Sequence, residues 1–313
     1  MISKKLFFSI GIILLCAVNV NAISYLYICG INDGKLIKMD PESGVIIDTI
    51  NDGGLNNAQG ICLGPDNYLY VSSYNSNQIL RYDREGNFID VFSQGTSMMY
   101  PMGMDFGPDG YLYVASNNET THFQILKVNP SNGNVSVFAN GNPLYKPHGI
   151  EFGPDGLLYV CNQTGHNIIA YDVLSNTYEG VFIDGYSAPI DITFSSNFDV
   201  YVADYLANRV YILDQNGNQV DTLITGQSGY VYGLALDEAS NILYVNNYGT
   251  SNVHKFDLST KLLLDTFYTG ANNNYPTFIE FVSFSTDVIP EPTTIILFLS
   301  GVIALLRKKN TVL

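Results

Sequence analysis

A phrase built around Leu-Tyr-Val recurs six times along the chain, and this repeat constrains the fold more than any other feature of the sequence. Successive copies are 42 to 46 residues apart, with their tyrosines at Tyr27, Tyr70, Tyr113, Tyr159, Tyr201 and Tyr244. Helical repeats of similar length carry apolar residues every three or four positions, whereas no copy here contains a long amphipathic run. The period instead matches one four-stranded blade of a β-propeller.

Each copy divides into four short apolar segments separated by turn residues. The clearest copies, PMGMDFGPDGYLYV (101–114) and PHGIEFGPDGLLYV (147–160), place a Gly-Pro-Asp-Gly turn between the first two segments. A third segment follows, such as QILRYD (78–83), and then a fourth, such as FIDVF (88–92). Proline and glycine stand where tight β-turns require them, so each copy predicts a four-stranded antiparallel blade.

The two ends of the repeat region predict how a ring would close. The chain enters at a second segment, SYLYIC (24–29), and further segments follow at 34–40 and 44–50. It finishes on a lone first segment, PTFIEFVS (276–283). We therefore expect an all-β fold, a six-bladed β-propeller of four-stranded blades, closed by pairing the N-terminal strands with a C-terminal inner strand. Such closure leaves no unpaired radial seam, and the propeller domain is predicted to span 23–286.

The composition agrees with this fold and limits the partners. The sequence has 28 Gly and 23 Tyr, which suits turns and strands, and a net charge of −15. This charge argues against nucleic acid or an anionic membrane surface as a partner. Three cysteines in the repeat region, Cys29, Cys62 and Cys161, lack the C-x-x-C spacing of a zinc site. We expect them to be buried apolar residues.

The N-terminal residues 1–22 have the three parts of a secretory signal peptide. A pair of lysines begins the segment, residues 6–18 form its apolar core, and a Val-Asn-Ala sequence at 20–22 provides the cleavage site. Cys16 is an alternative acceptor for bacterial lipoprotein processing, but the leucines before it are bulkier than that processing favours. The sequence therefore predicts export.

The C-terminal residues 287–313 place a Pro-Glu-Pro motif, an apolar stretch and a basic cluster in that order. As a helix, the stretch 295–306 spans about 18 Å, which is short of the roughly 30 Å hydrocarbon core of a membrane. The basic cluster would stay cytoplasmic. An ordinary short transmembrane anchor is one interpretation of this pattern. The residues of the motif and the cluster are Pro290, Glu291, Pro292, Arg307, Lys308 and Lys309.

The same order of motif, short apolar helix and basic end resembles the PEP-CTERM sorting signal of Gram-negative bacteria. The resemblance implies that an exosortase, a membrane-embedded transpeptidase, recognises and processes the segment. It also implies a host that makes extracellular polysaccharide. On this interpretation the protein is exported, held transiently in the membrane by its C-terminal segment, and then located at the cell surface or outside the cell.

The repeats resemble NHL repeats and the six-bladed propellers of lactonases and lyases, most clearly in VADYLANRVYILDQNG (202–217). The resemblance to gluconolactonase-type enzymes implies calcium or zinc ligands at the entry to the first strands. Here only Gln59 and Asp191, with Asp204 nearby, offer oxygens, and a hard cation needs six or more. The PHGI sequence around His148 resembles a histidine site of virginiamycin B lyase-like enzymes, but no second histidine occupies an equivalent position.

The candidate binding residues lie at the predicted channel mouth. In a propeller, the entries to the first strands share one face with the loops between the second and third strands. The entry positions are Gln59, Met102, His148, Ile190, Tyr232 and Thr277. A second ring stands four residues after the repeat tyrosine, at Ile31, Tyr74, Asn117, Gln163, Tyr205 and Tyr248. Tyrosine offers an apolar plate with a polar tip, and amides complement hydroxyl groups without charge. We predict a binding face of Tyr74, Asn117, His148, Gln163, Asp191, Tyr205 and Tyr248.

These features predict a non-enzymatic binding module at the bacterial envelope or in the extracellular matrix, with no cofactor. Its expected partners are the exosortase-type transpeptidase and an extracellular polysaccharide or protein. The alternative is an extracellular metal-dependent hydrolase or lyase of the gluconolactonase or virginiamycin B lyase type. It would place His148 and Asp191 near the chemistry and calcium or zinc at the channel mouth. A purely structural spacer is a third interpretation, which the sequence does not separate from the first.

Replacing Pro290, Glu291 and Pro292 by alanine tests the sorting interpretation. We expect the variant to be exported but to keep its C-terminal segment, because the processing enzyme would no longer recognise the motif. Immunoblots of cell fractions distinguish the unprocessed from the mature form. Alanines at Thr293 and Thr294 are the matched control, and normal maturation of the triple variant would identify the segment as an ordinary anchor.

Overall fold

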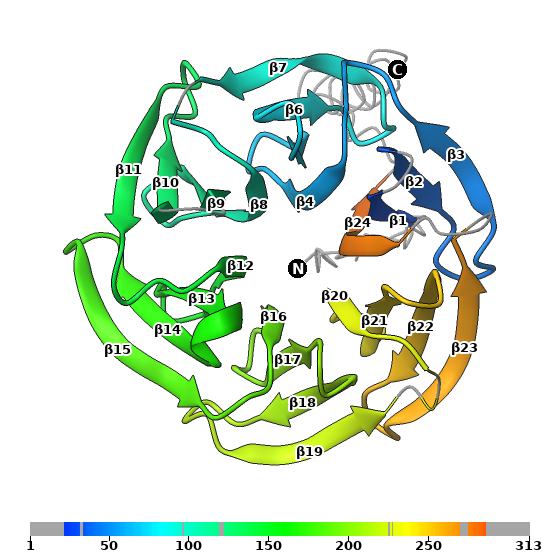
Figure 1. Cartoon of the computed structure of the whole chain (residues 1–313). Coiled ribbons are helices and arrows are strands. Elements are labelled where there is room, and N and C mark those ends of the chain that lie inside the picture. The colour runs from blue at the N-terminus through cyan, green and yellow to red at the C-terminus, as the bar shows by residue number, and fades with distance from the viewer. Residues whose placement is uncertain are drawn as a thin grey trace, which may run out of the picture. The chain divides into compact units, whose positions relative to one another are not determined.

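A computed structural model shows six four-stranded antiparallel sheets arranged as the blades of a β-propeller around a central channel (Figure 1). It describes residues 22–31, 34–95, 97–118, 122–224, 226, 228–269 and 275–285. The predicted fold class is confirmed, and Ser24–Val282 form one compact unit. Nearly all of the predicted signal peptide and the whole sorting segment lie outside the described residues. Within the described residues, no helix is long and apolar enough to span a membrane.

Blades 1 to 5 follow the chain from the innermost strand outward (Figure 1). Blade 1 consists of β4 (Ala58–Leu63), β5 (Leu69–Ser73), β6 (Gln78–Tyr82) and β7 (Phe88–Gln94). Blade 2 consists of β8 (Pro101–Phe106), β9 (Leu112–Asn118), β10 (His122–Val128) and β11 (Val135–Asn140). Blade 3 consists of β12 (Pro147–Phe152), β13 (Leu158–Asn162), β14 (Asn167–Asp172) and β15 (Thr177–Asp184), with a short 3-10 turn η1 (Gln163–Gly165). Blade 4 consists of β16 (Pro189–Phe194), β17 (Val200–Asp204), β18 (Arg209–Leu213) and β19 (Gln219–Ile224). Blade 5 consists of β20 (Val231–Asp237), β21 (Ile242–Asn247), β22 (Asn252–Asp257) and β23 (Leu262–Tyr268).

Blade 6 is composite, as the sequence predicts. Its strand order is β24 (Pro276–Ser285), β1 (Ala22–Gly30), β2 (Leu36–Met39) and β3 (Ile46–Ile50). The inner strand β24 is also tied to both neighbouring blades. The Thr277 hydroxyl donates to the carbonyl oxygen of Gln59 in blade 1 at 3.1 Å, and Asn246 of blade 5 donates to the carbonyl oxygen of Thr277 at 2.8 Å. The two ends of the propeller therefore close the ring together.

The repeat tyrosine packs each blade against the next. Three of these buried rings meet the phenylalanine that ends the following inner strand, with centroids 4.8 to 5.4 Å apart, in the pairs Tyr70–Phe106, Tyr113–Phe152 and Tyr159–Phe194. Their hydroxyls donate hydrogen bonds of 2.8 to 3.0 Å to the aspartate of the turn in their own blade, as Tyr70 does to Asp66. In these three blades one side chain thus satisfies its polar group locally and buries its ring between blades. The hydroxyls of Tyr27 and Tyr244 instead donate to backbone carbonyls of the next blade, at Arg84 and Pro41.

The repeat glycine brings neighbouring inner strands close together. A Cβ atom on Gly60 would lie 2.1 Å from the carbonyl oxygen of Met102 in blade 2. Gly103, Gly149 and Gly233 meet backbone oxygens of the next inner strand in the same way, at 2.3 to 2.7 Å. A side chain at these positions would force adjacent blades apart, so the glycines determine how tightly the channel wall is built.

The three cysteines of the propeller are buried and free, so the prediction that they are buried is confirmed. Cys29 and Cys62 form no disulfide with each other. Burial raises the pKa of both thiols. They are therefore protonated and poorly reactive, because the thiolate is the nucleophilic form.

Substituting a repeat glycine tests the packing of the inner strands. We expect Gly60→Ala to lower the free energy of unfolding by about 3 kcal/mol, because its Cβ would overlap the backbone of Met102. Gly54→Ala is the matched control: no atom lies within 4 Å of its added Cβ, although its φ is +82°. It should cost about 1 kcal/mol, from the left-handed backbone alone. Urea denaturation of both variants measures the difference, and equal losses would contradict the packing argument.

Candidate functional site

One end of the channel, here called the entry face, is formed where the inner strands begin and the second strands end. The same backbone hydrogen bond recurs there in all six blades. The N–H of the residue in the predicted second ring donates to the carbonyl of the residue that precedes the inner strand. These bonds, of 2.7 to 3.4 Å, join Ile31 to Tyr275, Tyr74 to Asn57, Asn117 to Tyr100, Gln163 to Lys146, Tyr205 to Ala188 and Tyr248 to Tyr230. The six positions of the predicted ring are therefore structurally equivalent.

Three tyrosine pairs cross blade boundaries on the entry face. Tyr205, directly after β17 of blade 4, stacks on Tyr230 of blade 5, with ring centroids 4.4 Å apart and an interplanar angle of 14°. Tilted pairs, with interplanar angles of 35° and 31°, occupy the equivalent position at two further boundaries, Tyr74–Tyr100 and Tyr248–Tyr275. In both of these pairs the centroids are 4.8 Å apart. Each tyrosine of the predicted ring thus has an aromatic partner from the next blade.

A buried aromatic cluster around Tyr232 joins two of these pairs. The Tyr232 ring stacks on Tyr248 with centroids 5.7 Å apart and meets Tyr205 edge-on at 6.0 Å. It also meets Phe278 of blade 6 edge-on at 5.6 Å. On a further side, the Tyr232 hydroxyl lies 3.4 Å from Nδ1 of His148. The side chain of Tyr232 is only 6% exposed, so the cluster links blades 3, 4, 5 and 6 at the channel mouth.

His148 is neutral in this environment. Burial, followed by the charge of Lys146, lowers its pKa to about 3, against the opposing effect of a polar contact with Gln163. Its Nδ1 faces Tyr232, whereas its Nε2 has no hydrogen-bond partner among the described residues. A catalytic base is most effective when its pKa lies near the working pH. His148 therefore suits hydrogen bonding better than proton abstraction.

Three amide side chains near the mouth bury carbonyl oxygens that have no partner within the described part of the chain. They are Oε1 of Gln59, Oδ1 of Asn117 and Oε1 of Gln163. The amide nitrogen of Gln59 is satisfied, because it donates to Oδ1 of Asn57 at 2.9 Å. Buried polar atoms are nearly always hydrogen-bonded, so this set of acceptors distinguishes the entry face from an ordinary loop surface.

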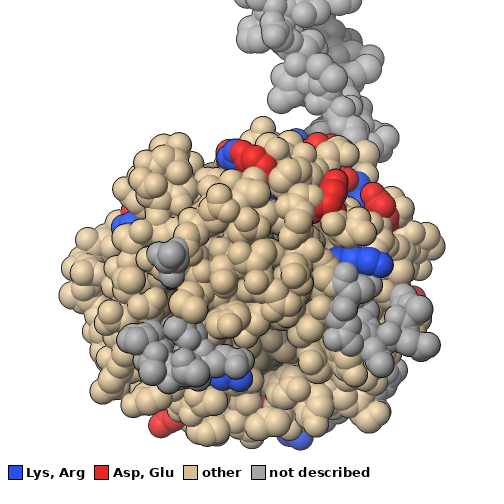
Figure 2. All heavy atoms as spheres, turned by 45° about the horizontal axis from the view of Figure 1, so that its top comes forward, with Lys and Arg blue, Asp and Glu red and all other residues tan. Residues whose placement is uncertain are grey.

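Formal charge is scarce on the entry face. In the loops that form it, the only charged residues that the structure describes are Lys35, Asp52 and Lys146. Figure 2 shows a similar scarcity over much of one face of the ring, with charged side chains mostly toward its margin. A neutral surface rich in tyrosine suits an uncharged ligand better than a metal ion or a polyanion.

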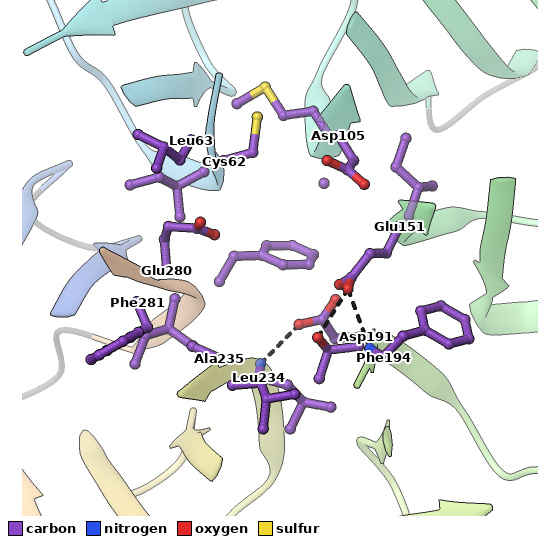
Figure 3. Close-up of a pocket in the computed structure, with 18 of the residues that line it drawn as sticks. Cys62, Leu63, Asp105, Glu151, Asp191, Phe194, Leu234, Ala235, Glu280 and Phe281 are labelled. Atoms are coloured by element: carbon purple, nitrogen blue, oxygen red, sulfur yellow. Dashed lines mark hydrogen bonds between the residues drawn. The ribbon is translucent and has the colours of Figure 1, made fainter. Parts of the chain in front are cut away.

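Toward the opposite end, the channel contains a cavity of about 300 Å³ with acidic walls (Figure 3). Asp105, Glu151, Asp191 and Glu280 point into it from blades 2, 3, 4 and 6. None of the six entry positions lines this cavity. The channel thus has two chemically different parts, a neutral aromatic mouth and an acidic interior.

The acidic side chains of the cavity connect adjacent blades. Asp105 accepts a hydrogen bond from the N–H of Phe152 in blade 3 at 2.8 Å, and Glu151 accepts one from the N–H of Phe194 in blade 4 at 3.3 Å. Asp191 accepts from the N–H of Leu234 in blade 5 at 2.8 Å. Glu280 is bonded to the backbone N–H of Leu63 in blade 1. These carboxyl groups therefore have a structural role around the ring.

Enclosure by the ring raises the pKa of all four carboxyl groups. Burial raises the pKa of Asp105 to about 6 and that of Asp191 and Glu280 to about 8, against the opposing effect of their backbone hydrogen bonds. The pKa of Glu151 is also raised, by burial and then by the charges of Asp105 and Asp191. At neutral pH several of these groups hold protons, so the interior carries less charge than its composition indicates.

The three oxygen ligands considered for a cation do not form one site. Both oxygens of Asp204 accept backbone hydrogen bonds, from Ser187 at 2.7 Å and Ala188 at 3.0 Å, and so hold the loop before β16. Asp191 lines the acidic cavity, whereas Gln59 lies at the entry face. In the described ranges, no three His, Cys, Asp or Glu side chains are arranged to hold a metal ion. Gln59, Asp191 and Asp204 thus do not come together as the ligands of one metal ion.

The structure brings some of the predicted binding residues together and separates others. His148, Tyr205 and Tyr248 meet through Tyr232, and Gln163 contacts His148. Tyr74 and Asn117 occupy equivalent ring positions, and Tyr74 forms its own pair with Tyr100. Asp191 is placed elsewhere, because its side chain lines the acidic cavity and no hydrogen bond in the described chain joins it to His148.

Two sets of residues were not predicted from the sequence, although each recurs at one position of the repeat. Tyr100, Tyr230 and Tyr275 directly precede an inner strand, so a tyrosine recurs at one position in three repeats. Asp105, Glu151 and Glu280 recur two residues after the position of the repeat glycine, which Phe278 occupies in blade 6. Because strand side chains alternate in direction, that position also faces the channel.

Comparison with known proteins supports the fold. No protein-family model matches the chain, and no curated protein matches its sequence. A chain of a nidogen–laminin complex superposes with a TM-score of 0.69 at 17% identity, over 82% of this chain and 98% of that chain. A protein of unknown function from Bacteroides caccae gives 0.64 at 13% identity, over 83% and 98%. A catalytically inactive virginiamycin B lyase from Staphylococcus aureus, solved with quinupristin, gives 0.58 at 16% identity, over 83% and 92%. At these identities the likeness establishes the fold alone.

The buried carboxyl groups predict a dependence of stability on pH. Their folded pKa values lie above the unfolded values near 4, so the folded state holds protons that unfolding releases. Their contribution is fully present below about pH 4 and is lost as the pH rises toward 8. We expect the melting temperature to fall between pH 5 and pH 8, and Asp191→Asn to reduce that slope. The exposed Asp184→Asn is the control, and equal slopes for both variants would contradict the role of Asp191.

Proposed function

We propose that the protein is an exported, non-enzymatic binding module whose binding surface is the entry face of the propeller. The observation that carries this proposal is the set of three cross-blade tyrosine pairs around neutral, unpartnered polar groups. The NHL-like repeats and the PEP-CTERM-like terminus support an exosortase-processed protein of a Gram-negative envelope or extracellular matrix. The ligand would then be an extracellular polysaccharide or protein.

The tyrosine pairs are not needed to close the ring of blades. The other three blade boundaries have Ile31, Asn117 and Gln163 at the equivalent position, and the ring closes there without such a pair. Packing between blades is already provided by the repeat tyrosines and the glycines. Tyr230 is 41% exposed, which leaves part of its ring available to a ligand. Aromatic side chains with a polar tip are enriched where proteins bind partners.

A second candidate function is an extracellular lyase or hydrolase, favoured by the fold shared with virginiamycin B lyase. It would use His148 at the channel mouth. Two observations weigh against it: the low pKa of His148 and the separate position of Asp191. The shared fold supports binding equally well, because the nidogen–laminin complex also contains a chain with this fold.

The triple variant Tyr74→Ala, Tyr205→Ala, Tyr248→Ala tests the binding face. We expect retention of the protein on extracellular material from the cells that make it to fall at least tenfold, since each lost aromatic contact contributes about 0.5 to 1.5 kcal/mol. Affinity chromatography measures this, and circular dichroism checks the fold of the variant. Tyr178→Ala removes a tyrosine that is 45% exposed from the outer strand β15, away from the entry face, and is the control. Unchanged retention of a folded triple variant would end the proposal.

A further inference from the structure

We propose that the ligand of the entry face is a neutral glycan, bound between blades 3, 4 and 5. This inference rests on the proposed binding function and specifies its ligand class. Blade 3 provides Nε2 of His148 and Oε1 of Gln163, while blades 4 and 5 provide the stacked rings of Tyr205 and Tyr230 beside Tyr248. A pair of buried polar groups and an aromatic plate thus stand next to each other.

Nε2 of His148 and Oε1 of Gln163 form no hydrogen bond of good geometry within the described residues, although the two side chains contact each other, and a ligand group that both donates and accepts would satisfy both atoms. The carbonyl oxygen of Gln163 can only accept a hydrogen bond, whereas Nε2 of neutral His148 donates or accepts according to its tautomer. A hydroxyl group satisfies either state, because it carries one donor and two acceptor lone pairs. A peptide N–H only donates and a peptide carbonyl only accepts, so a peptide must present the matching group to each atom, whereas a hydroxyl fits either one; several adjacent hydroxyls therefore suit the pair better.

The polar pair and the tyrosine plate are separated by a single aromatic ring. Tyr232 reaches His148 with its hydroxyl at 3.4 Å, and the same ring contacts Tyr205 and Tyr248. A ligand that spans this ring needs one flat, weakly polar face for the tyrosines and hydroxyl groups at its edge for Gln163 and His148. Sugar rings combine these two surfaces in one unit.

Electrostatics favour a neutral sugar over a charged one. The burial that holds His148 neutral would also penalise any charge on the ligand. The sequence carries a net charge of −15, which repels anionic polymers at long range. Lys146 is the cation that influences His148 most directly, and it is not fully buried. One partly buried lysine is a weak basis for binding a polyanion.

The decisive experiment uses the full-length protein and two fractions of extracellular material from the cells that make it. One fraction is polysaccharide freed of protein, and the other is protein freed of polysaccharide. We expect retention on the polysaccharide fraction, with an affinity that changes less than twofold between 50 and 500 mM NaCl because no ion pair is involved. Tyr230→Ala should weaken this binding about fivefold, and Gln163→Met about tenfold. Tyr178→Ala should leave it unchanged.

Each outcome separates the ligand class from the binding function. Retention on the protein fraction alone would overturn the glycan inference and leave the binding function standing. Retention on neither fraction would end both. Polysaccharide binding that weakens more than tenfold in high salt would overturn the neutral character of the ligand. Gln163→Met keeps the length of the side chain and removes its amide group, donor and acceptor together, so a folded variant with unchanged binding would exclude the proposed polar contact.

Discussion

The close approach of successive inner strands is the constraint on which the rest of the structure depends. It is possible because Gly60, Gly103, Gly149 and Gly233 present no side chain toward the backbone of the next blade. The repeat tyrosines then fill the wider space farther out, where blades diverge and rings pack against phenylalanines. Closure through β24 makes each of these contacts depend on the others, because a ring has no free end to relax.

This tight inner ring also divides the channel into two chemical environments. Where Asp191 and Phe278 replace the glycine, their side chains enter the channel. Asp191 joins the acidic cavity, and Phe278 packs on Tyr232 at the mouth. Carboxyl groups deep in the channel bond to backbone N–H groups of the following blade and so contribute to the wall. Polar side chains at the mouth are mostly uncharged, and some have no hydrogen-bond partner among the described residues, which supports the proposed binding surface.

Much of this arrangement could be predicted from the sequence because each repeat contains the strands and turns of one whole blade. The repeat length predicted a four-stranded blade, and the repeat divided between the two ends of the domain predicted how the ring closes. The equal spacing after the repeat tyrosine correctly placed Tyr74, Tyr205 and Tyr248 at equivalent positions. The partners Tyr100, Tyr230 and Tyr275 were missed, because a contact between consecutive blades joins positions that the repeat keeps apart. Asp191 was assigned to the mouth because it directly follows the entry position Ile190, which is equivalent to His148, yet adjacent strand residues face opposite directions.

The sequence by itself determined the number of blades, the composite blade and the positions available at the channel mouth. Those properties follow from local periodicity and turn chemistry, which each repeat encodes within its own residues. Only the tertiary structure decided which tyrosines stack, which carboxyl groups share the cavity, and that His148 is neutral. Those properties depend on distances between blades and on exclusion of water by the closed ring. Both arise only when all six repeats have packed together.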